Sequence, residues 1–186
     1  MDLEISNGDL LISPPAIPDK RFSKTIMMIA SHGENHTMAL CMNRPTEYTI
    51  NKIVEPLGLH LDVDYEIYWG GPVSMQTVWM LHDPVWEVEN TLNINDHWSI
   101  TSHESMFHHL ADGDIPQRFR FFLGHAGWAA GQLEMEIQGQ EPWNHKHSWL
   151  VLKQPDPDWL INDDIDRLWT TATGLCSQQT VSTWLE

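Results

Sequence analysis

Hydrophobic residues in this chain gather in short runs bounded by turn residues, a pattern typical of buried strands. The runs Thr25–Ala30 and Thr37–Met42 flank the turn-rich segment Ser31–His36, so they predict a β-hairpin. The alternation over Arg118–Phe121 predicts a half-exposed strand that continues toward Gly124. Five further runs predict strands at Leu10–Ile12, Glu66–Trp69, Val78–Leu81, Ser99–Thr101 and Trp149–Leu152.

Helical spacing of apolar residues appears in three other segments. Between Ile50 and Leu57 they recur at i, i+3, i+4 and i+7, with Thr49 before them as an N-cap and Gly58 just after the last one. This combination predicts a short helix. Similar stripes predict helices over His103–Ala111 and from Ile165 to Ala172.

The segment Gln132–Ile137 fits two structures, because its apolar residues alternate as in a strand and also align with Ala129 on one helical face. Elsewhere, hairpin strands come early and helices are interspersed without a regular βαβ order. This order predicts the α+β class with a mixed sheet. No repeat, linker or low-complexity tract divides the chain, so we expect residues 1–186 to form a single domain.

The charge of the chain narrows the choice of partners. There are 26 acidic and 10 basic residues, which gives a formal net charge of −16. Nucleic-acid binding draws most of its affinity from Lys and Arg on phosphates, and the few basic residues are not gathered in the sequence. Direct nucleic-acid binding is therefore the least expected function. The favoured interpretation of the charge is a solvated acidic surface. The alternative, which makes a more specific functional claim, is a surface that binds a basic or cationic partner.

The two cysteines, Cys41 and Cys176, are too few for a disulfide framework. The N-terminal residues lack the basic-then-apolar pattern of a signal peptide, and no apolar run approaches the length of a membrane span. These features predict a cytoplasmic protein without membrane association. Ten tryptophans fit a core and a binding surface equally well.

No recognisable catalytic motif stands out. The G-x-S-x-G nucleophile elbow is absent. His103-Glu104 begins like a zinc-protease helix, but that motif needs its second His at the position of Phe107. We therefore predict no catalytic residue, no metal site and no cofactor, and we favour a protein that does not catalyse a reaction.

Three loops at strand ends are candidates for a ligand or partner surface. The glycine-rich segment Gly124–Gln132 could open a helix whose backbone N–H groups hold an anion, or it could be a purely structural strand–helix turn. Arg44 could bind a carboxylate or phosphate, or pair with an acidic side chain. The candidate residues are Asn43, Arg44, Gly70, Gly71, Gly124, Gly127, Trp128, Gly131 and Gln132.

Six short segments, taken together and in this order, resemble the AlgH/YqgE family of small bacterial proteins. They are Gly8–Pro14, Asp19 with Phe22, Asn43–Pro45, Gly70–Val73, Leu81-His82 and Gly124–Glu134. The resemblance covers roughly residues 8–152. The sequence departs from the family pattern at His125, where an aromatic residue is common, and at Ala129-Ala130, where Gly-Pro is common.

The resemblance implies a mixed α+β structure in which a strongly curved sheet closes into a pseudo-barrel with interspersed helices. It also implies that Gln132–Ile137 is helical. The family carries the label of transcriptional regulator, with no agreed enzymatic activity or cofactor.

The sequence alone does not decide between two functions. The favoured one is a non-catalytic binding or regulatory protein that acts through a protein partner or a small ligand. The alternative is an enzyme or sensor for a small anionic, phosphate- or carboxylate-bearing molecule. That alternative requires the loops around Arg44 and Gly127 to converge.

Overall fold

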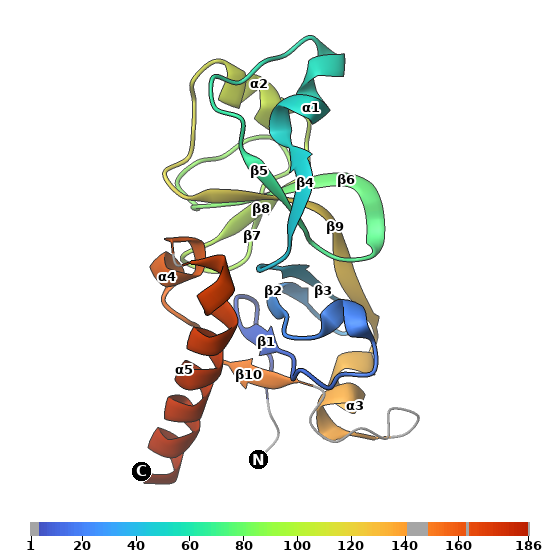
Figure 1. Cartoon of the computed structure of the whole chain (residues 1–186), viewed down its shortest axis with the longest axis vertical. Coiled ribbons are helices and arrows are strands. Elements are labelled where there is room, and N and C mark those ends of the chain that lie inside the picture. The colour runs from blue at the N-terminus through green and yellow to red at the C-terminus, as the bar shows by residue number, and fades with distance from the viewer. Residues whose placement is uncertain (1–3, 141–148, 163, 186) are drawn as a thin grey trace.

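The computed structural model describes residues 4–140, 149–162 and 164–185 (Figure 1). The strands are β1 (Leu10–Ile12), β2 (Ile26–His32), β3 (His36–Cys41), β4 (Pro45–Thr49), β5 (Glu66–Trp69), β6 (Val73–His82), β7 (Leu92–Asn93), β8 (Ser99–Thr101), β9 (Phe119–Ala129) and β10 (Leu150–Leu152). The helices are η1 (Lys20–Phe22), α1 (Ile50–Val54), η2 (Glu55–Leu57), α2 (Ser105–Ala111), α3 (Gln132–Gln138), α4 (Pro157–Asn162) and α5 (Ile165–Leu185).

The strands form a strongly curled sheet in the order β10-β1-β2-β3-β9-β6-β8-β7, and β5 pairs with both β4 and β9. The β5–β9 pairing is parallel, whereas β9 runs antiparallel to β3 and β6. The predicted α+β class with a mixed, curved sheet is therefore confirmed. The predicted hairpin is also present, as the antiparallel pair β2–β3.

Strand β9 joins the two halves of the molecule. In Figure 1 it runs from the upper half, beside β5, β6 and β8, to the lower half, beside β2 and β3. Its first residues pair with β5 and β6, and its last residues pair with β3. A displacement of β9 would therefore disturb both halves.

The strands β1 and β2 are buried on both faces. Leu10 and Met28 face one core, which α4 and α5 cover, while Leu11 and Met27 face a second core. Successive side chains of a strand point to opposite faces, so a strand buried on both faces reads as a continuous apolar run. A third core lies between β5, β6, β9 and the helices α1 and α2.

Arg120 corrects the expectation of a half-exposed strand over Arg118–Phe121. Its side chain is buried, and it donates hydrogen bonds to the carbonyl oxygens of Met42 (2.8 Å) and Ile161 (3.1 Å). The guanidinium also lies 4.3 Å from the ring centroid of Tyr68. Burial lowers the pKa of Arg120. Polar alternation in the sequence therefore marked a buried cross-link and not a solvent-facing position.

The three helices predicted from apolar spacing are present as α1, α2 and α5, and one predicted capping contact is absent. The helix α1 continues into η2 and ends at Gly58, which adopts the left-handed conformation (φ 74°) typical of helix ends. Thr49 occupies the N-cap position, but its side chain makes no capping hydrogen bond. The segment Gln132–Ile137 lies within α3, as the family resemblance implied. None of the helices in the described part of the chain is both long and apolar enough to span a bilayer.

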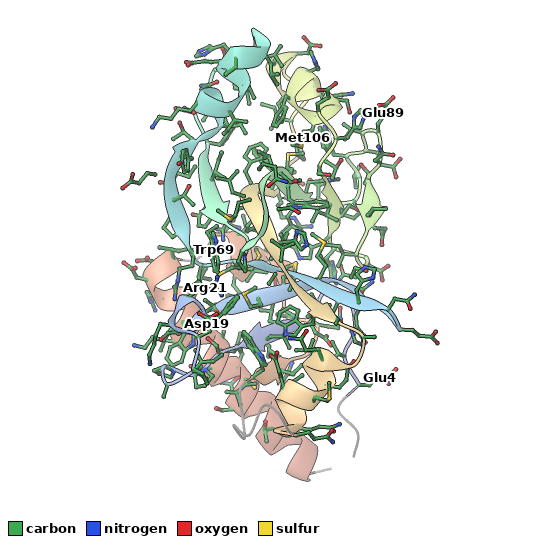
Figure 2. The ribbon with its side chains drawn as sticks, turned by 90° about the vertical axis from the view of Figure 1, so that its right-hand side faces the viewer. Glu4, Asp19, Arg21, Trp69, Glu89 and Met106 are labelled. Carbon is green, nitrogen blue, oxygen red and sulfur yellow. The ribbon has the colours of Figure 1, made fainter. Side chains whose placement is uncertain are left out.

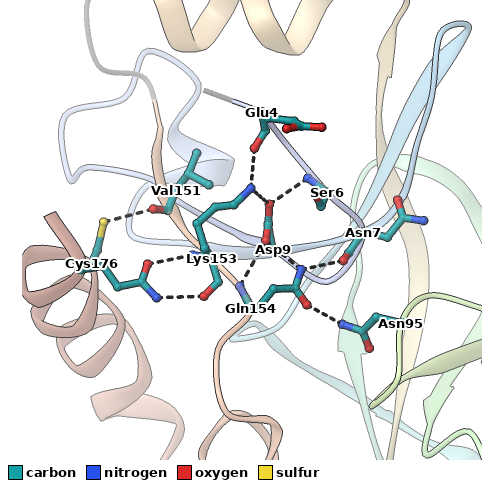
Figure 3. A network of polar contacts seen from close by, with 10 residues as sticks. Glu4, Ser6, Asn7, Asp9, Asn95, Val151, Lys153, Gln154 and Cys176 are labelled. Carbon is teal, nitrogen blue, oxygen red and sulfur yellow. Dashed lines mark hydrogen bonds and ion pairs between the residues drawn. The ribbon is translucent and has the colours of Figure 1, made fainter. Parts of the chain in front are cut away.

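Asp9 is the centre of a polar network that ties the N-terminal segment to β10 (Figure 3). Its carboxylate is fully buried and accepts hydrogen bonds from Lys153 Nζ (2.6 Å) and from the backbone N–H of Ser6 (2.8 Å). Gln154 donates to it from its backbone N–H (3.2 Å) and its side chain (3.0 Å). Gln179 of α5 exchanges two hydrogen bonds with the main chain of Lys153, so the network extends to the C-terminal helix.

We expect Asp9→Ala to lower the free energy of unfolding by about 2–3 kcal/mol, because it removes a fully buried carboxylate that accepts four hydrogen bonds from partly buried donors. Asp158→Ala is a matched control, since that exposed carboxylate also pairs with one basic side chain, Arg118, at 2.9 Å. An exposed pair contributes about 1 kcal/mol or less. Urea denaturation measures both, and equal losses in the two variants would contradict the assignment.

His82 makes the stability depend on pH. Its side chain is fully buried against Trp86, and burial lowers its pKa, while Asp83 and Glu87 oppose that shift. The folded state thus resists a proton that the unfolded state accepts below its ordinary pKa of 6.5. The contribution of His82 is fully present above that pH and is lost as the pH falls through it.

We therefore expect the wild type to lose up to about 1.4 kcal/mol of stability per pH unit below about pH 6.5 through this one group. His82→Phe keeps a ring against Trp86 but cannot titrate, so its stability should fall less steeply. Urea midpoints measured between about pH 7.5 and about pH 5 test this. Parallel curves for the two proteins would show that His82 does not titrate on unfolding.

Candidate functional site

The candidate loops meet beside the middle of β9. The backbone N–H of Trp69 donates to the carbonyl of Arg44 (2.7 Å), and the N–H of Gly70 donates to the carbonyl of Leu123 (2.8 Å). The N–H of Cys41 in turn donates to the carbonyl of Gly70 (2.9 Å). The segments around residues 43–45, 70–71 and 123–127 therefore lie side by side, although they are far apart in the sequence.

Asn43 has a structural role in this arrangement. Its buried side chain accepts a hydrogen bond from the N–H of Ile26 (3.0 Å) and donates one to the carbonyl of Lys24 (2.9 Å). It therefore fixes the start of β2 to the end of β3. With both ends of its amide used, Asn43 offers little to a ligand.

Arg44 is half-buried and donates to main-chain carbonyls. Its guanidinium donates to the carbonyl oxygens of Asn43 (3.3 Å) and Ser23. In the described part of the chain it forms no ion pair. The described contacts of Arg44 are thus with main-chain oxygens, and they include neither the acidic side chain nor a ligand that the sequence offered as alternatives.

The glycines at 70, 71 and 124 serve a close approach of two main chains. A Cβ at Gly71 would lie 2.1 Å from the carbonyl carbon of His125, and one at Gly70 would lie 2.2 Å from the carbonyl oxygen of Gly124. Gly124 also has a left-handed backbone (φ 65°). These positions exclude side chains because backbone packs on backbone there.

The glycine-rich segment is a strand for most of its length. Strand β9 continues through Ala129, and Gly127 and Trp128 pair with Met38 and Thr37 of β3. The predicted strand–helix turn is confined to Ala130 and Gly131, and Gly131, with φ 71°, precedes the helix α3. The turn is therefore shorter than the sequence suggested, because the main chain of Gly127 and Trp128 is paired within the sheet.

A cavity of about 300 Å³ lies beside this end of β9. One side is formed by η1 and the segment before it, and the other by β9, α3 and the residue preceding β10. In Figure 2 the labelled side chains of Asp19, Arg21 and Trp69 lie near one another at mid-height on this side of the molecule. The lining residues are Ile17, Pro18, Asp19, Arg21, Phe22, Pro72, Val73, Ala126, Gly127, Trp128, Gln132, Glu136 and Trp149.

Glu136 organises the polar part of this cavity. The indole N–H groups of Trp128 and Trp149 both donate to Glu136 Oε2, each at 3.1 Å. The amide of Gln132 donates to Glu136 Oε1 at 3.0 Å, and its own oxygen accepts from the N–H of Ala129 at 3.0 Å. The carboxylate is thereby held in one position by three donors, which fixes both indole rings.

Aromatic rings supply much of the remaining cavity wall. Trp128 and Trp149 have centroids 6.0 Å apart at an interplanar angle of 79°. Phe22 lies 6.2 Å from Trp149 at 71° and 5.6 Å from Trp69 at 45°. The two edge-to-face pairs, Trp128 with Trp149 and Phe22 with Trp149, add stability beyond the area that they bury.

Asp19 and Arg21 neutralise each other at the cavity rim. Arg21 Nη2 lies 2.6 Å from Asp19 Oδ2, and Arg21 Nε contacts both carboxylate oxygens at 3.1 Å. The hydrogen bond from Arg21 lowers the pKa of Asp19, and the same pair raises the pKa of Arg21. The pair is exposed, so it defines the rim more than it stabilises the fold.

A more open depression adjoins the cavity and contains Arg44. The two hollows share Arg21 and Pro72. Of the candidate residues, Gly127, Trp128 and Gln132 line the cavity, and Arg44 lines the depression. The structure thus brings the predicted loops to one face without placing Arg44 and Gly127 in the same hollow.

The chemistry of the cavity suits binding. None of the described residues that line it is Ser, Thr, Cys, His or Lys. Glu136 accepts three hydrogen bonds, which hold its carboxylate in one position. Elsewhere in the described ranges, no three His, Cys, Asp or Glu side chains are grouped so as to hold a metal ion.

Sequence reasoning missed Phe22, Trp149 and Glu136 as parts of one site. Glu136 follows Gln132 by four residues, a spacing that places both on one face once the segment is known to be helical. Trp149 and Phe22 come from distant segments, and no local pattern connects them to α3. The abundance of Trp was a further visible signal, but it did not show which Trp residues meet.

Comparisons with known proteins give a consistent result. The profile of the AlgH-like family matches residues 10–180. A UPF0301 protein of Xanthomonas oryzae is 32% identical over 173 residues, covering 90% of this chain and 87% of its own. A UPF0301 protein of Ralstonia nicotianae is 31% identical, covering 83% of this chain and 80% of its own.

Two solved structures are also similar. The solution structure of the AlgH protein from Pseudomonas aeruginosa superposes with a TM-score of 0.73 at 27% identity, covering 92% of each chain. The crystal structure of protein DIP2367 from Corynebacterium diphtheriae has a TM-score of 0.64 at 19% identity and covers 88% of this chain and 82% of its own. The second likeness concerns the fold alone.

The close approach at Gly71 gives a prediction for this face. We expect Gly71→Ala to lower the free energy of unfolding by about 3 kcal/mol or more, since the methyl group would overlap the main chain of β9. Gly33→Ala is the control, because nothing lies within 4 Å of a Cβ there. Its effect should stay within about 0.5 kcal/mol. Chemical denaturation of both variants measures the difference, and similar small effects would contradict the packing described.

Proposed function

This chain belongs to the AlgH-like family, and from that premise we propose that it is a non-catalytic binding protein whose cavity beside α3 takes a small ligand. The observation that carries the proposal is the fixed Glu136 carboxylate between two buried indoles. Binding sites are typically concave and mostly apolar, with a few well-placed polar groups. This cavity has that composition and lies at the small end of the usual size range.

A regulatory role would follow from ligand binding and not from contact with DNA. Three of the ten basic residues are already engaged within the fold. Arg118 pairs with Asp158, Arg120 is buried, and Arg21 pairs with Asp19. With a net charge of −16, the molecule would be repelled by nucleic acid at long range. We therefore infer that any effect on transcription passes through the ligand or a protein partner.

A cytoplasmic location is part of the same proposal. Cys41 and Cys176 are both free and buried, which agrees with a reducing compartment. Burial raises the pKa of the Cys41 thiol to about 12, so this group stays protonated and unreactive at neutral pH.

The second candidate function is a sensor or enzyme for a small anion, and Arg44 favours it. This guanidinium lines an open depression and makes no ion pair in the described part of the chain. Arg is the preferred residue for recognising carboxylate and phosphate groups. The first candidate is preferred because the cavity is more enclosed and its polar groups are fixed by neighbours.

A thermal-shift screen separates the two candidates. The panel holds nucleotides, sugar phosphates, carboxylates, divalent metals, neutral aromatic compounds and organic cations, each on wild type, Gly127→Leu and Arg44→Ala. A Cβ at Gly127 would lie 3.9 Å from Val73 Cγ2, so a leucine there can fit without a backbone clash and narrow the cavity. We expect a ligand whose shift is lost in Gly127→Leu and kept in Arg44→Ala.

A ligand at about 100 times its Kd should add about 2.7 kcal/mol of stability, which a melting curve resolves easily. A shift lost only in Arg44→Ala would move the anion site to the front. No shift with any compound would argue against a small-ligand cavity and turn attention to a protein partner.

A further inference from the structure

The cavity wall is aromatic and partly desolvated. Trp128 and Trp149 are 6% and 5% exposed, and their rings stand at 79° to each other. Phe22 is half-buried and stands at 71° to Trp149. These steep angles exclude parallel stacking, and all three rings belong to residues that line the cavity. Electron-rich ring faces attract cations, and the attraction grows when the site is shielded from water.

The charged groups of the cavity point to the same class of ligand. Two carboxylates, Asp19 and Glu136, and one guanidinium, Arg21, line it. The positive charge of Arg21 is compensated by Asp19, whose carboxylate accepts three hydrogen bonds from the guanidinium at 2.6 to 3.1 Å. Glu136 is bound only by neutral donors, two indoles and an amide, so its negative charge has no cationic partner among the described residues. Counted over the described residues alone, the cavity therefore carries one uncompensated negative charge.

The polar contacts of Glu136 also restrict the shape of the ligand. Its three donors leave little room for a further strong hydrogen bond, so a cation rich in N–H groups gains less than one that spreads its charge over methyl groups. A volume of about 300 Å³ accommodates a small organic ion. Inorganic cations find few oxygen ligands here, since Asp19 and Glu136 supply the only carboxylates among the described lining residues and both are already engaged.

We propose that this cavity binds a small organic cation with an alkylated ammonium head, held by Phe22, Trp128 and Trp149 and balanced by Glu136. The proposal rests on the proposed function, because it names the class of ligand that the same cavity takes. The indole N–H bonds to Glu136 hold the two Trp rings in position, so Glu136 acts both as counter-charge and as the support of the aromatic wall.

The test compares choline with its neutral isostere, in which a quaternary carbon replaces the nitrogen. Size and shape are the same, so any difference in affinity reports the charge. We expect choline to bind wild type at least about tenfold more tightly in calorimetric titrations at matched sodium chloride concentration. A trimethyllysine peptide in a second arm shows whether the ammonium group is preferred free or on the side chain of a partner.

Two variants with the same substitution on one helix locate the effect. Glu136→Gln keeps an acceptor for the indoles but removes the charge, so choline should bind about tenfold more weakly while the isostere is unaffected. Glu134→Gln is the matched control. That side chain lies 3.4 Å from His32 and does not line the cavity, so both ligands should bind as in wild type. Melting curves without ligand confirm that both variants are folded.

Phe22→Leu tests independently whether the aromatic wall contributes to choline binding. It removes one ring while keeping an apolar side chain, and choline affinity should fall several-fold with little change for the isostere.

Equal affinity of wild type for choline and its isostere would overturn the cation proposal. So would equal losses in Glu136→Gln and Glu134→Gln. Suppose that neutral compounds in the screen bind wild type but not Gly127→Leu, and that choline does not bind. In that case only the cation proposal fails. If no compound binds at all, the proposed binding function fails with it.

Discussion

The contact of main chain on main chain between Gly70-Gly71 and β9 is the constraint on which the rest of the structure depends. No side chain fits between these segments, because a Cβ at Gly71 would lie 2.1 Å from the chain of His125. The contact holds β5 and the start of β6 against the middle of β9. It thereby fixes where β9 passes from one half of the sheet to the other, and it sets the position of Gly127 and Trp128 at the cavity.

Asp9, Arg120 and Glu136 are each held by several hydrogen-bond partners, but their surroundings differ. Asp9 and Arg120 are enclosed and join distant segments of the chain. Glu136 differs, because it lines a cavity while three neutral donors hold it. A carboxylate fixed in this way keeps its charge directed into a space that a ligand can enter. That combination is why the binding interpretation is preferred over a catalytic one.

The sequence predicted the elements better than it predicted the site. Short apolar runs located β1, β2, β3, β5 and β8, because residues buried on both faces leave a clear local signal. The strand containing Arg120 was misread as half-exposed, because a buried Arg and a solvent-facing Arg look alike in a pattern. The glycine-rich segment was expected to be a turn, although most of it is a strand. Gly124 has a left-handed backbone and also lies close to the main chain of Gly71, and a glycine of this kind does not reveal by itself whether it lies in a turn or in a strand.

The sequence by itself determined the α+β class, most element positions, the acidic surface and the family resemblance, because each is carried by local pattern, composition or short motifs. Only the tertiary structure decided which side chains share a site. Phe22, Glu136 and Trp149 lie far apart in the chain, and their meeting follows from the curl of the sheet and the docking of η1 and α3. Contacts of this kind depend on the summed packing of many residues, so no local segment encodes them.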